Sequence, residues 1–178
     1  METCYIRLYM KGIEKPFIFE VSEAEQNKFR NHLDGVGFFV FETVNGFFVA
    51  VNLEGVQAFN LLWEPALISA SAPGKADDRW PDAEIAVFLR NRERPYATNA
   101  SEPKEIYVVL ETLTEGFVDD GEDLFVGFQD EDGEEVYFNT QQTLLIRVSA
   151  LVYRQGEALI GDEGEDDDDD DDDDEDLF

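Results

Sequence analysis

The chain has 178 residues, 43% of them hydrophobic, and its formal net charge at pH 7 is −29. A protein this acidic repels phosphate backbones and attracts basic proteins or cations, so generic duplex binding is not expected. Cys4 is the single cysteine and cannot form a disulfide within the chain, and no apolar run approaches the roughly 20 residues of a membrane-spanning helix.

The N-terminal third is predicted to form a first β-rich lobe, residues 1–68, with one helix. Residues 4–10 and 16–21 have the apolar alternation of strands. Ser22 then begins a helix to about residue 33, with Glu25 three residues later as the second half of a capping box.

The clearest local signal is an Asn45-Gly46 pair between two β-rich runs, residues 37–43 and 47–52. Such a pair favours a type I′ hairpin, in which both turn residues have positive φ. Residues 56–63 are predicted as the strand that completes the lobe.

Residues 69–103 differ in character and are predicted to be a connector with a short helix. Pro81 is suited to the first turn of a helix that ends near Arg92. Ile85, Phe88 and Leu89 would form the buried face of this helix.

A second β-rich lobe is predicted over residues 104–160. Its strands are expected at 105–112, 124–128, 135–139 and 143–148, the last running on towards Tyr153. Residues 130–133, Asp-Glu-Asp-Gly, are predicted to be a hairpin turn. An EF-hand calcium loop is disfavoured because Phe128 and Asn139 would occupy its first and last ligand positions.

The two hairpin regions are similar to each other. A shift of 87 positions aligns five identical pairs, namely Phe38 with Phe125, Phe41 with Phe128, Gly46 with Gly133, Val49 with Val136 and Asn52 with Asn139. This spacing indicates an internal duplication. Chance combined with the shared sequence preferences of hairpins remains the alternative.

The predicted fold is therefore α+β and mainly β, with two related small-barrel lobes joined by a helical connector. Each lobe, with its helix, bent strands and hairpin ending in Asn, resembles the small β-barrels of the Sm type. No RNA-binding residues are carried over from this resemblance.

Catalytic and metal-binding signatures are not found in the sequence, and no cofactor or metal is predicted. His32 is expected at the surface and Cys4 in a strand core. The aromatic side chains of residues 38–48 are expected to be buried, with a base-stacking surface as the alternative. Arg90, Arg92 and Arg94 form a basic cluster, either a solvated helix end or a contact for a nucleic acid or the protein's own tail.

Residues 161–178 are predicted to be a disordered, polyacidic tail, because nine consecutive Asp residues, 166–174, repel one another. The last 17 residues hold 14 of the 42 acidic side chains, so residues 1–161 keep a net charge of −15. The chain then ends in Leu177 and Phe178. This ending resembles the acidic C-terminal tip of single-stranded-DNA-binding proteins, although Leu177 stands where Pro is usual. The resemblance implies that the tip docks on a partner through six residues: Asp166, Asp170, Asp174, Asp176, Leu177 and Phe178.

The function expected from these features is that of a non-enzymatic acidic protein that engages a basic protein partner, with nucleic-acid mimicry or competition as one form of it. One alternative is a single-stranded nucleic-acid-binding protein whose tail competes for its own groove. Another is an enzyme with a carboxylate-based site. The N-terminus lacks the basic and apolar segments of a signal peptide, so a cytoplasmic location is expected. Salt adaptation would also account for the acidity, and the oligomeric state is left open.

Overall fold

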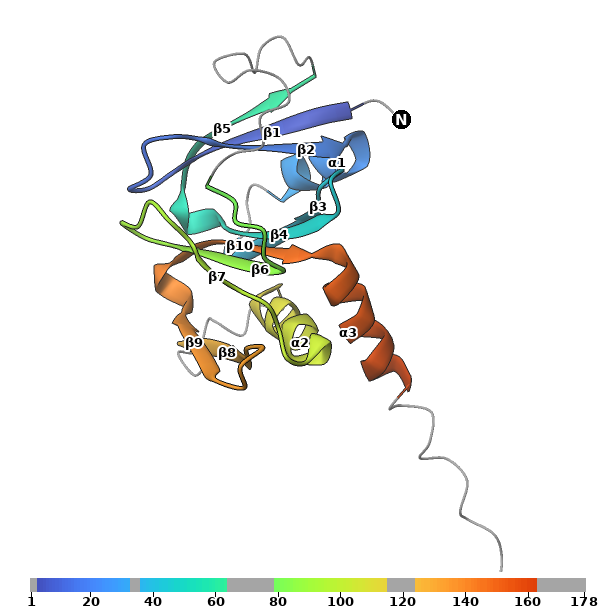
Figure 1. Ribbon diagram of the computed structural model, residues 1–178. Helices are drawn as coiled ribbons and strands as arrows, with labels where there is room; N and C mark the ends of the chain where they lie inside the picture. Colours follow the sequence, from blue (N-terminus) through green and yellow to red (C-terminus); the bar gives the residue numbers. More distant parts are fainter. Residues whose placement is uncertain (1–2, 33–35, 64–78, 115–123, 163–178) are drawn as a thin grey trace, which may run out of the picture.

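A computed structural model describes residues 3–32, 36–63, 79–114 and 124–162 (Figure 1). This part of the chain is mainly β, with three α-helices and two short 3-10 helices, η1 and η4. The elements in chain order are β1 (Thr3–Met10), β2 (Phe17–Ser22), α1 (Glu23–Asn31), β3 (Phe38–Glu42), β4 (Phe47–Asn52), η1 (Leu53–Gly55), β5 (Val56–Leu62), β6 (Ile85–Leu89), β7 (Tyr96–Thr98), α2 (Pro103–Thr114), β8 (Phe125–Gln129), β9 (Glu135–Asn139), η4 (Thr140–Gln142), β10 (Thr143–Ser149) and α3 (Ala150–Asp162).

The strands form three antiparallel sheets. Their orders are β2-β1-β5, β3-β4-β10-β6-β7 and β8-β9. The five-stranded sheet lies in the middle of the molecule, with the β1 sheet and α1 on one side and α2, α3 and the β8–β9 hairpin on the other (Figure 1). It is built from both halves of the chain, because β4 pairs with β10 in the register Leu145–Val51 to Ser149–Phe47.

Two hydrophobic cores lie on opposite faces of this central sheet. The first joins the β1 sheet and α1 to one face and contains Phe17, Phe29 and Phe41. The second joins α2, α3 and the β8–β9 hairpin to the other face and contains Ile106, Leu110 and Phe138. Strand β10 supplies Leu145 to the first core and Ile146 to the second, which explains why it is buried along six of its seven residues.

Among the described residues, the elements from β1 to β5 and those from β6 to β10 follow the same order: two strands, a helix, two strands, a 3-10 helix and a final strand. Helix α3 follows the second set. The pairing of the strands also corresponds, since β1 pairs with β2 and β5, and β6 pairs with β7 and β10. Hydrogen bonds at equivalent places repeat: Lys11 N–H donates to the Gly55 carbonyl and Arg90 N–H to the Gln142 carbonyl, both at 2.8 Å.

The first hairpin turn differs from the type I′ prediction. Gly46 has φ of +82°, whereas Asn45 is not among the residues with positive φ. Gly46 N–H donates to the Thr43 carbonyl at 3.1 Å, and Thr43 N–H to the Phe47 carbonyl at 2.8 Å. This is a longer turn closed by a left-handed glycine, the geometry of a bulged three-residue loop. The turn at Asp130–Gly133 has the same two bonds, at 2.9 and 3.0 Å.

The first helix follows the prediction, and Ser22 caps it by accepting a hydrogen bond from Glu25 N–H at 3.2 Å. The capping box is not closed, because the Glu25 carboxylate instead accepts from the backbone N–H of Glu42 at 3.2 Å. Glu105 does the same for Gln129 N–H at 2.6 Å. In each half, a carboxylate on the helix thus fixes the end of the neighbouring strand.

Two predicted elements have the wrong type. Residues 81–92, predicted as a helix, contain β6, because Ile85–Leu89 is an apolar run buried between the two cores rather than one face of a helix. Residues 105–112, predicted as a strand, lie in α2, whose buried positions Ile106, Val109, Leu110 and Leu113 have helical spacing. The strand expected to run on to Tyr153 ends at Ser149, where α3 begins.

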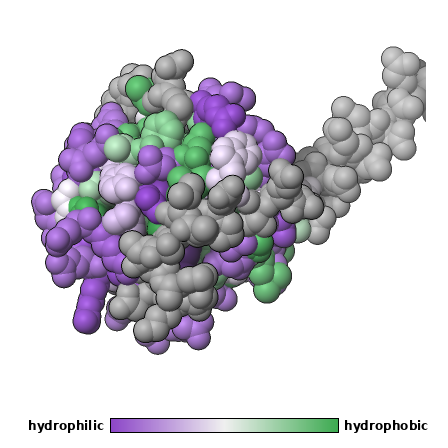
Figure 2. Space-filling view, turned by 90° about the horizontal axis from the view of Figure 1, so that it is seen from above, coloured by the Kyte–Doolittle hydropathy of each residue, from purple (hydrophilic) through white to green (hydrophobic). Residues whose placement is uncertain are grey.

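Two barrel lobes with a helical connector are not observed. The sheets of the described residues are open, and the edge of the first half continues into the second through the β4–β10 pair. None of the described helices is both long and apolar enough to span a membrane. Seen from the β1–β5 side, the surface is mostly hydrophilic, with hydrophobic side chains gathered near its middle (Figure 2).

Candidate functional site: the paired turns and the acidic hairpin

The turns between β1 and β2 and between β6 and β7 lie side by side. Gly12 has φ of +76° and Asn91, at the equivalent place, has φ of 59°. A Cβ atom at Gly12 would lie 2.8 Å from Asn91 Oδ1, so the two turns are in direct contact. We call residues 11–16 and 90–95 the paired turns. Their sequences, Lys-Gly-Ile-Glu-Lys-Pro and Arg-Asn-Arg-Glu-Arg-Pro, match in charge at positions 1, 4 and 5.

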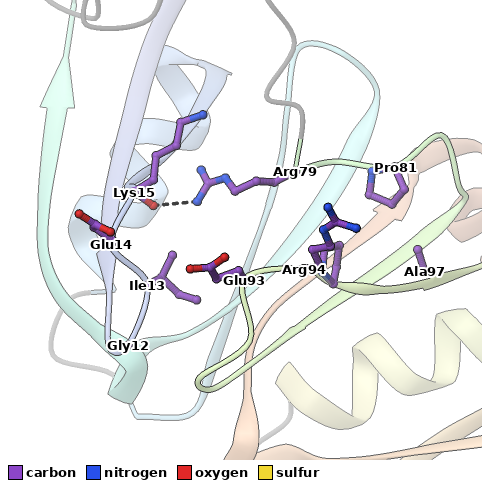
Figure 3. A pocket seen from close by; sticks show the side chains of 10 residues that line it. Gly12, Ile13, Glu14, Lys15, Arg79, Pro81, Glu93, Arg94 and Ala97 are labelled. Carbon is purple, nitrogen blue, oxygen red and sulfur yellow. Dashed lines mark hydrogen bonds between the residues drawn. The ribbon is translucent and has the colours of Figure 1, made fainter.

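A polar cleft of about 830 Å³ opens beside the paired turns (Figure 3). It is lined by three cationic side chains, Lys15, Arg79 and Arg94, and by the carboxylates Glu14 and Glu93, together with Gly12, Ile13, Pro81, Pro95 and Ala97. The cations come from three separate segments of an otherwise acidic chain. The cleft is therefore suited to a ligand that carries negative charge next to hydrogen-bond donors.

Arg79 has a structural role at this cleft. Its guanidinium donates hydrogen bonds to the carbonyls of Lys15 and Pro16, at 2.7 and 2.8 Å, and lies 4.1 Å from the ring centre of Phe17. These contacts hold the first turn against the segment that leads into β6 (Figure 3).

The predicted cluster Arg90, Arg92 and Arg94 lies in the second of the paired turns and not at a helix end. Arg94 lines the large cleft, whereas Arg90 lines a second cavity of about 330 Å³ with Asn52 and Gln142. Arg92 is exposed and lines neither cavity. The cluster is thus divided between two cavities, and the helix-dipole explanation for it is wrong.

The densest group of described carboxylates lies at the tip of the β8–β9 hairpin. Asp130 is buried and its Oδ1 accepts the backbone N–H groups of Asp132 and Glu134, at 3.1 and 2.9 Å. Asp130 therefore builds the turn. The other acids of the turn are exposed, and we call them the acidic tip: Glu131, Asp132, Glu134 and Glu135.

The described residues contain no group of three or more His, Cys, Asp or Glu side chains arranged to hold a metal ion. Asp130 and its neighbours form a hairpin turn, as the sequence indicates. His32 is exposed, and its Nδ1 lies 3.0 Å from the Lys28 carbonyl. Cys4 is fully buried.

Arg147 is a buried cation that sequence reasoning missed. Its guanidinium donates to the carbonyls of Pro81 and Ala83, at 2.7 and 3.3 Å, and lies over the rings of Phe47 and Trp80. Burial lowers the pKa of Arg147, and the charge of Asp82 opposes this shift. Arg147 anchors the segment before β6. The sequence feature that could have indicated this role is a charged residue inside an otherwise apolar strand.

Tyr153, on α3, contacts both α2 and β4. Its hydroxyl donates to Glu111 Oε1 at 2.7 Å, and its ring packs on Phe48 and Tyr107. Burial, reinforced by the hydrogen bond to Glu111 and the charge of that carboxylate, raises the pKa of Tyr153 well above its ordinary value.

The predicted docking residues of the tail, Asp166, Asp170, Asp174, Asp176, Leu177 and Phe178, lie outside the described residues. No known protein family, curated protein or solved structure matches the chain. The similarities to Sm-type barrels and to the tips of single-stranded-DNA-binding proteins therefore stay predictions.

Proposed function

We propose that this protein is a non-enzymatic interaction protein that binds a basic protein partner through its acidic tip and its polyacidic C-terminal segment. The observation that carries the proposal is the charge: residues 1–161 have a net charge of −15, and the last 17 residues add 14 acidic side chains. Complementary charge of this kind raises association rates and selects basic partners.

The acidic tip supports this function because its carboxylates stand on a rigid turn. Glu131 is held by the Asn99 side chain at 3.0 Å, and its backbone N–H donates to the Asn99 carbonyl at 3.1 Å. A preorganised group of charges loses little conformational freedom on binding, so more of the electrostatic attraction contributes to affinity.

In the tail, charge and apolar contact are proposed to have separate roles. Asp166, Asp170, Asp174 and Asp176 would steer the segment to a basic rim, while Leu177 and Phe178 enter an apolar pocket. Steering mainly sets the association rate, and the aromatic anchor mainly sets the dissociation rate. Nucleic-acid mimicry is the form this function takes if the partner normally binds DNA or RNA.

The second candidate is single-stranded nucleic-acid binding, and the cleft at the paired turns favours it. Lys15, Arg79 and Arg94 line this cleft, and cationic grooves of this kind follow a nucleic-acid backbone. In that case the tail would compete with the nucleic acid for the same cations.

Both candidates are tested by measuring the binding of two probes, a folded basic protein such as lysozyme and an oligodeoxythymidine, to the full chain and to a chain that ends at Gly161. The proposal expects salt-sensitive binding of the basic protein, weaker for the truncated chain, and no oligonucleotide binding by either. Strong, salt-sensitive oligonucleotide binding after truncation would establish the second candidate instead. Failure of both chains to bind the basic protein would contradict the proposal.

A matched pair of variants separates the acidic tip from general acidity. The tip variant carries Glu131→Gln, Asp132→Asn, Glu134→Gln and Glu135→Gln. The control carries four changes at exposed carboxylates elsewhere: Glu20→Gln, Glu23→Gln, Glu54→Gln and Glu102→Gln. Both remove the same charge, and we expect the tip variant to bind the basic protein about tenfold more weakly than the control. Equal binding by the two variants would reduce the tip to part of a diffuse negative field.

A further inference from the structure

One face of the second hairpin is exposed although the equivalent face of the first hairpin is buried. Phe125 is 55% exposed, whereas Phe38, at the same place in β3, is 7% exposed. Tyr137 is 63% exposed, whereas Ala50, its equivalent in β4, is fully buried. The second hairpin therefore has an exposed aromatic surface, whereas the equivalent surface of the first hairpin is covered by other parts of the chain.

The cover of the first hairpin is known. Strand β4 pairs with β10, and this pairing places Phe38 and Ala50 in the second core, against α2 and β10. The equivalent of β4 is β9, and the equivalent of β10 is β5. Among the described residues, β9 pairs only with β8 and β5 only with β1. The described part of the chain thus forms this kind of strand pair once, between β4 and β10, and leaves the equivalent strands β9 and β5 unpaired with each other at two separate sheet edges.

We infer that β9 of one copy of this protein pairs with β5 of a second copy, in the way that β4 pairs with β10 within the chain. The 87-residue offset converts the observed pairs Arg147–Val49 and Ile146–Ala50 into Asn60–Val136 and Phe59–Tyr137. The partner is therefore a second copy, and the register is fixed.

The chemistry of the two edges fits this contact. Strand β5 has seven residues, VQAFNLL, with no charge among them. Uncharged edge strands of this length are templates for pairing, and proteins usually protect them with charges, bulges or prolines. Phe59 would face Tyr137, an aromatic cross-strand pair of the kind that stabilises sheets.

Phe125 would acquire the cover that Phe38 has. Within the chain, Phe38 belongs to the core that α2 covers. Helix α1 is the equivalent of α2, so Phe125 would lie against α1 of the second copy. Glu134 and Glu135 would lie opposite Leu62 and Leu61, so no carboxylate on β9 faces a carboxylate on β5.

The contact uses different surfaces on the two copies, so when it forms once between two copies it joins them head to tail. Such heterologous contacts generate rings or open chains rather than two-fold dimers. Each copy also carries a net charge of −29, and repulsion between copies is screened by salt. Self-association should therefore strengthen with added salt, the opposite of the behaviour expected for a basic partner.

The first test is sedimentation velocity of the full chain over a range of concentrations at low and high salt. The mean mass should rise above that of the monomer with both concentration and salt. Tyr137→Asp should weaken self-association at least tenfold. Leu151→Asp, which also places an aspartate at an exposed hydrophobic position (Leu151 of α3 is 67% exposed), should leave self-association unaltered. A full chain that stays monomeric throughout, or equal behaviour of the two variants, would overturn the inference.

The second test fixes the register with cysteines. Ala150 N–H donates to the Gly46 carbonyl at 2.9 Å, one residue pair beyond the end of the β4–β10 ladder. Hydrogen-bonded and non-hydrogen-bonded pairs alternate along an antiparallel ladder, so the odd-numbered residues of β10 are in the closer, non-hydrogen-bonded pairs. Asn60 and Val136 are equivalent to one of those, Arg147–Val49. Folded Asn60→Cys and Val136→Cys chains, mixed under mild oxidation, should form a disulfide-linked heterodimer. Cys4 does not compete because it is fully buried.

The controls in this experiment decide between possible arrangements. Asn60→Cys mixed with Glu134→Cys is displaced by two residues and should give little cross-linking. Cross-linking of Asn60→Cys with itself would show a β5–β5 contact and would overturn the head-to-tail arrangement, as would cross-linking that is independent of the cysteine position.

Discussion

Gly46 and Gly133 occupy the same position in two hairpin turns, and their φ angles of +82° and +78° are of the kind that side chains resist. Asn45 does not share this conformation. The Asn-Gly pair correctly predicts a turn but not its type, because the Thr43 hydroxyl accepts Phe47 N–H at 3.1 Å and stabilises the longer loop.

This turn geometry gives the first prediction. Gly46→Ala should lower the free energy of unfolding by about 1 kcal/mol, because alanine is strained at positive φ. Asn45→Ala should cost well under that amount, since its backbone is unstrained. Urea unfolding of the two variants checks both values. Equal losses at the two positions would favour the type I′ turn instead.

Tyr153 gives the second prediction, which concerns pH. Its pKa is raised in the folded protein, so the folded state holds the phenolic proton more tightly than the unfolded state does. This contribution to stability is complete below the unfolded pKa of about 10 and is lost as pH rises above it.

Tyr153→Phe should therefore lower the free energy of unfolding by about 1–2 kcal/mol at neutral pH through the lost hydrogen bond to Glu111. The deficit of the variant should shrink above pH about 10, because Tyr153 then ionises in the unfolded wild-type chain while the folded chain still holds its proton, and phenylalanine has no proton to lose. Urea unfolding at several pH values measures the difference, in which other titrating groups cancel. A deficit that is constant across pH would contradict the assignment.

At the scale of elements, α3 crosses α2 closely because Gly156 has no side chain. A Cβ atom there would lie 2.3 Å from the Pro103 carbonyl oxygen, which is backbone and cannot move away alone. Gly161, in the same helix, has open space around it.

The third prediction compares these two glycines. Alanine favours a helix interior over glycine by up to about 1 kcal/mol, so Gly161→Ala should be neutral or slightly stabilising. Gly156→Ala should destabilise by about 1–3 kcal/mol, because the overpacked crossing outweighs the propensity gain. Thermal or urea unfolding decides the sign. Stabilisation by both substitutions would show that the helices do not pack as described.

The sequence predicts the type of an element where a local signal, such as a helix cap or a turn glycine, determines it. It does not predict the type where burial in the folded protein determines it. The first helix and both hairpins follow from Ser22, Gly46 and Gly133. In contrast, Ile85–Leu89 has helical spacing within its apolar run, but burial on both sides makes it a strand. The run Ile106–Val109, with three β-branched residues, indicates a strand. In the structure it lies in α2, where Ile106 and Val109 face the second core and Val108 is 48% exposed.

The candidate site was only partly predictable, for a related reason. The shift of 87 residues aligns the later elements of each half, whereas the earlier ones, such as Lys11–Phe17 and Arg90–Tyr96, align at 79 residues. The offset between the halves changes from 79 to 87 residues between the paired turns and the later hairpins. A comparison without gaps at 87 residues therefore does not align the two paired turns with each other. Arg90, Arg92 and Arg94 were therefore found without their counterparts Lys11 and Lys15.

For the whole molecule, charge is unevenly distributed. The acidic tip belongs to the second half, whereas two of the three cations of the cleft, Lys15 and Arg94, lie in the paired turns. A duplication would account for the matching element order and stays a prediction, since similar hairpin preferences could also produce it. The two turns differ in charge: Thr43 and Val44 of the first turn correspond to Asp130 and Glu131 of the second, so only the second turn carries acidic side chains at these two positions.

The central claim is that the acidic C-terminal segment docks on a basic protein through Phe178. It is tested most directly by placing a photoreactive p-benzoylphenylalanine at position 178 of the full chain and identifying what it cross-links in cells. Our account predicts a small number of strongly basic proteins, captured less when salt is raised in permeabilised cells and absent when the same probe replaces exposed His32. Cross-links to nucleic acid alone, or the same products from both positions, would contradict it.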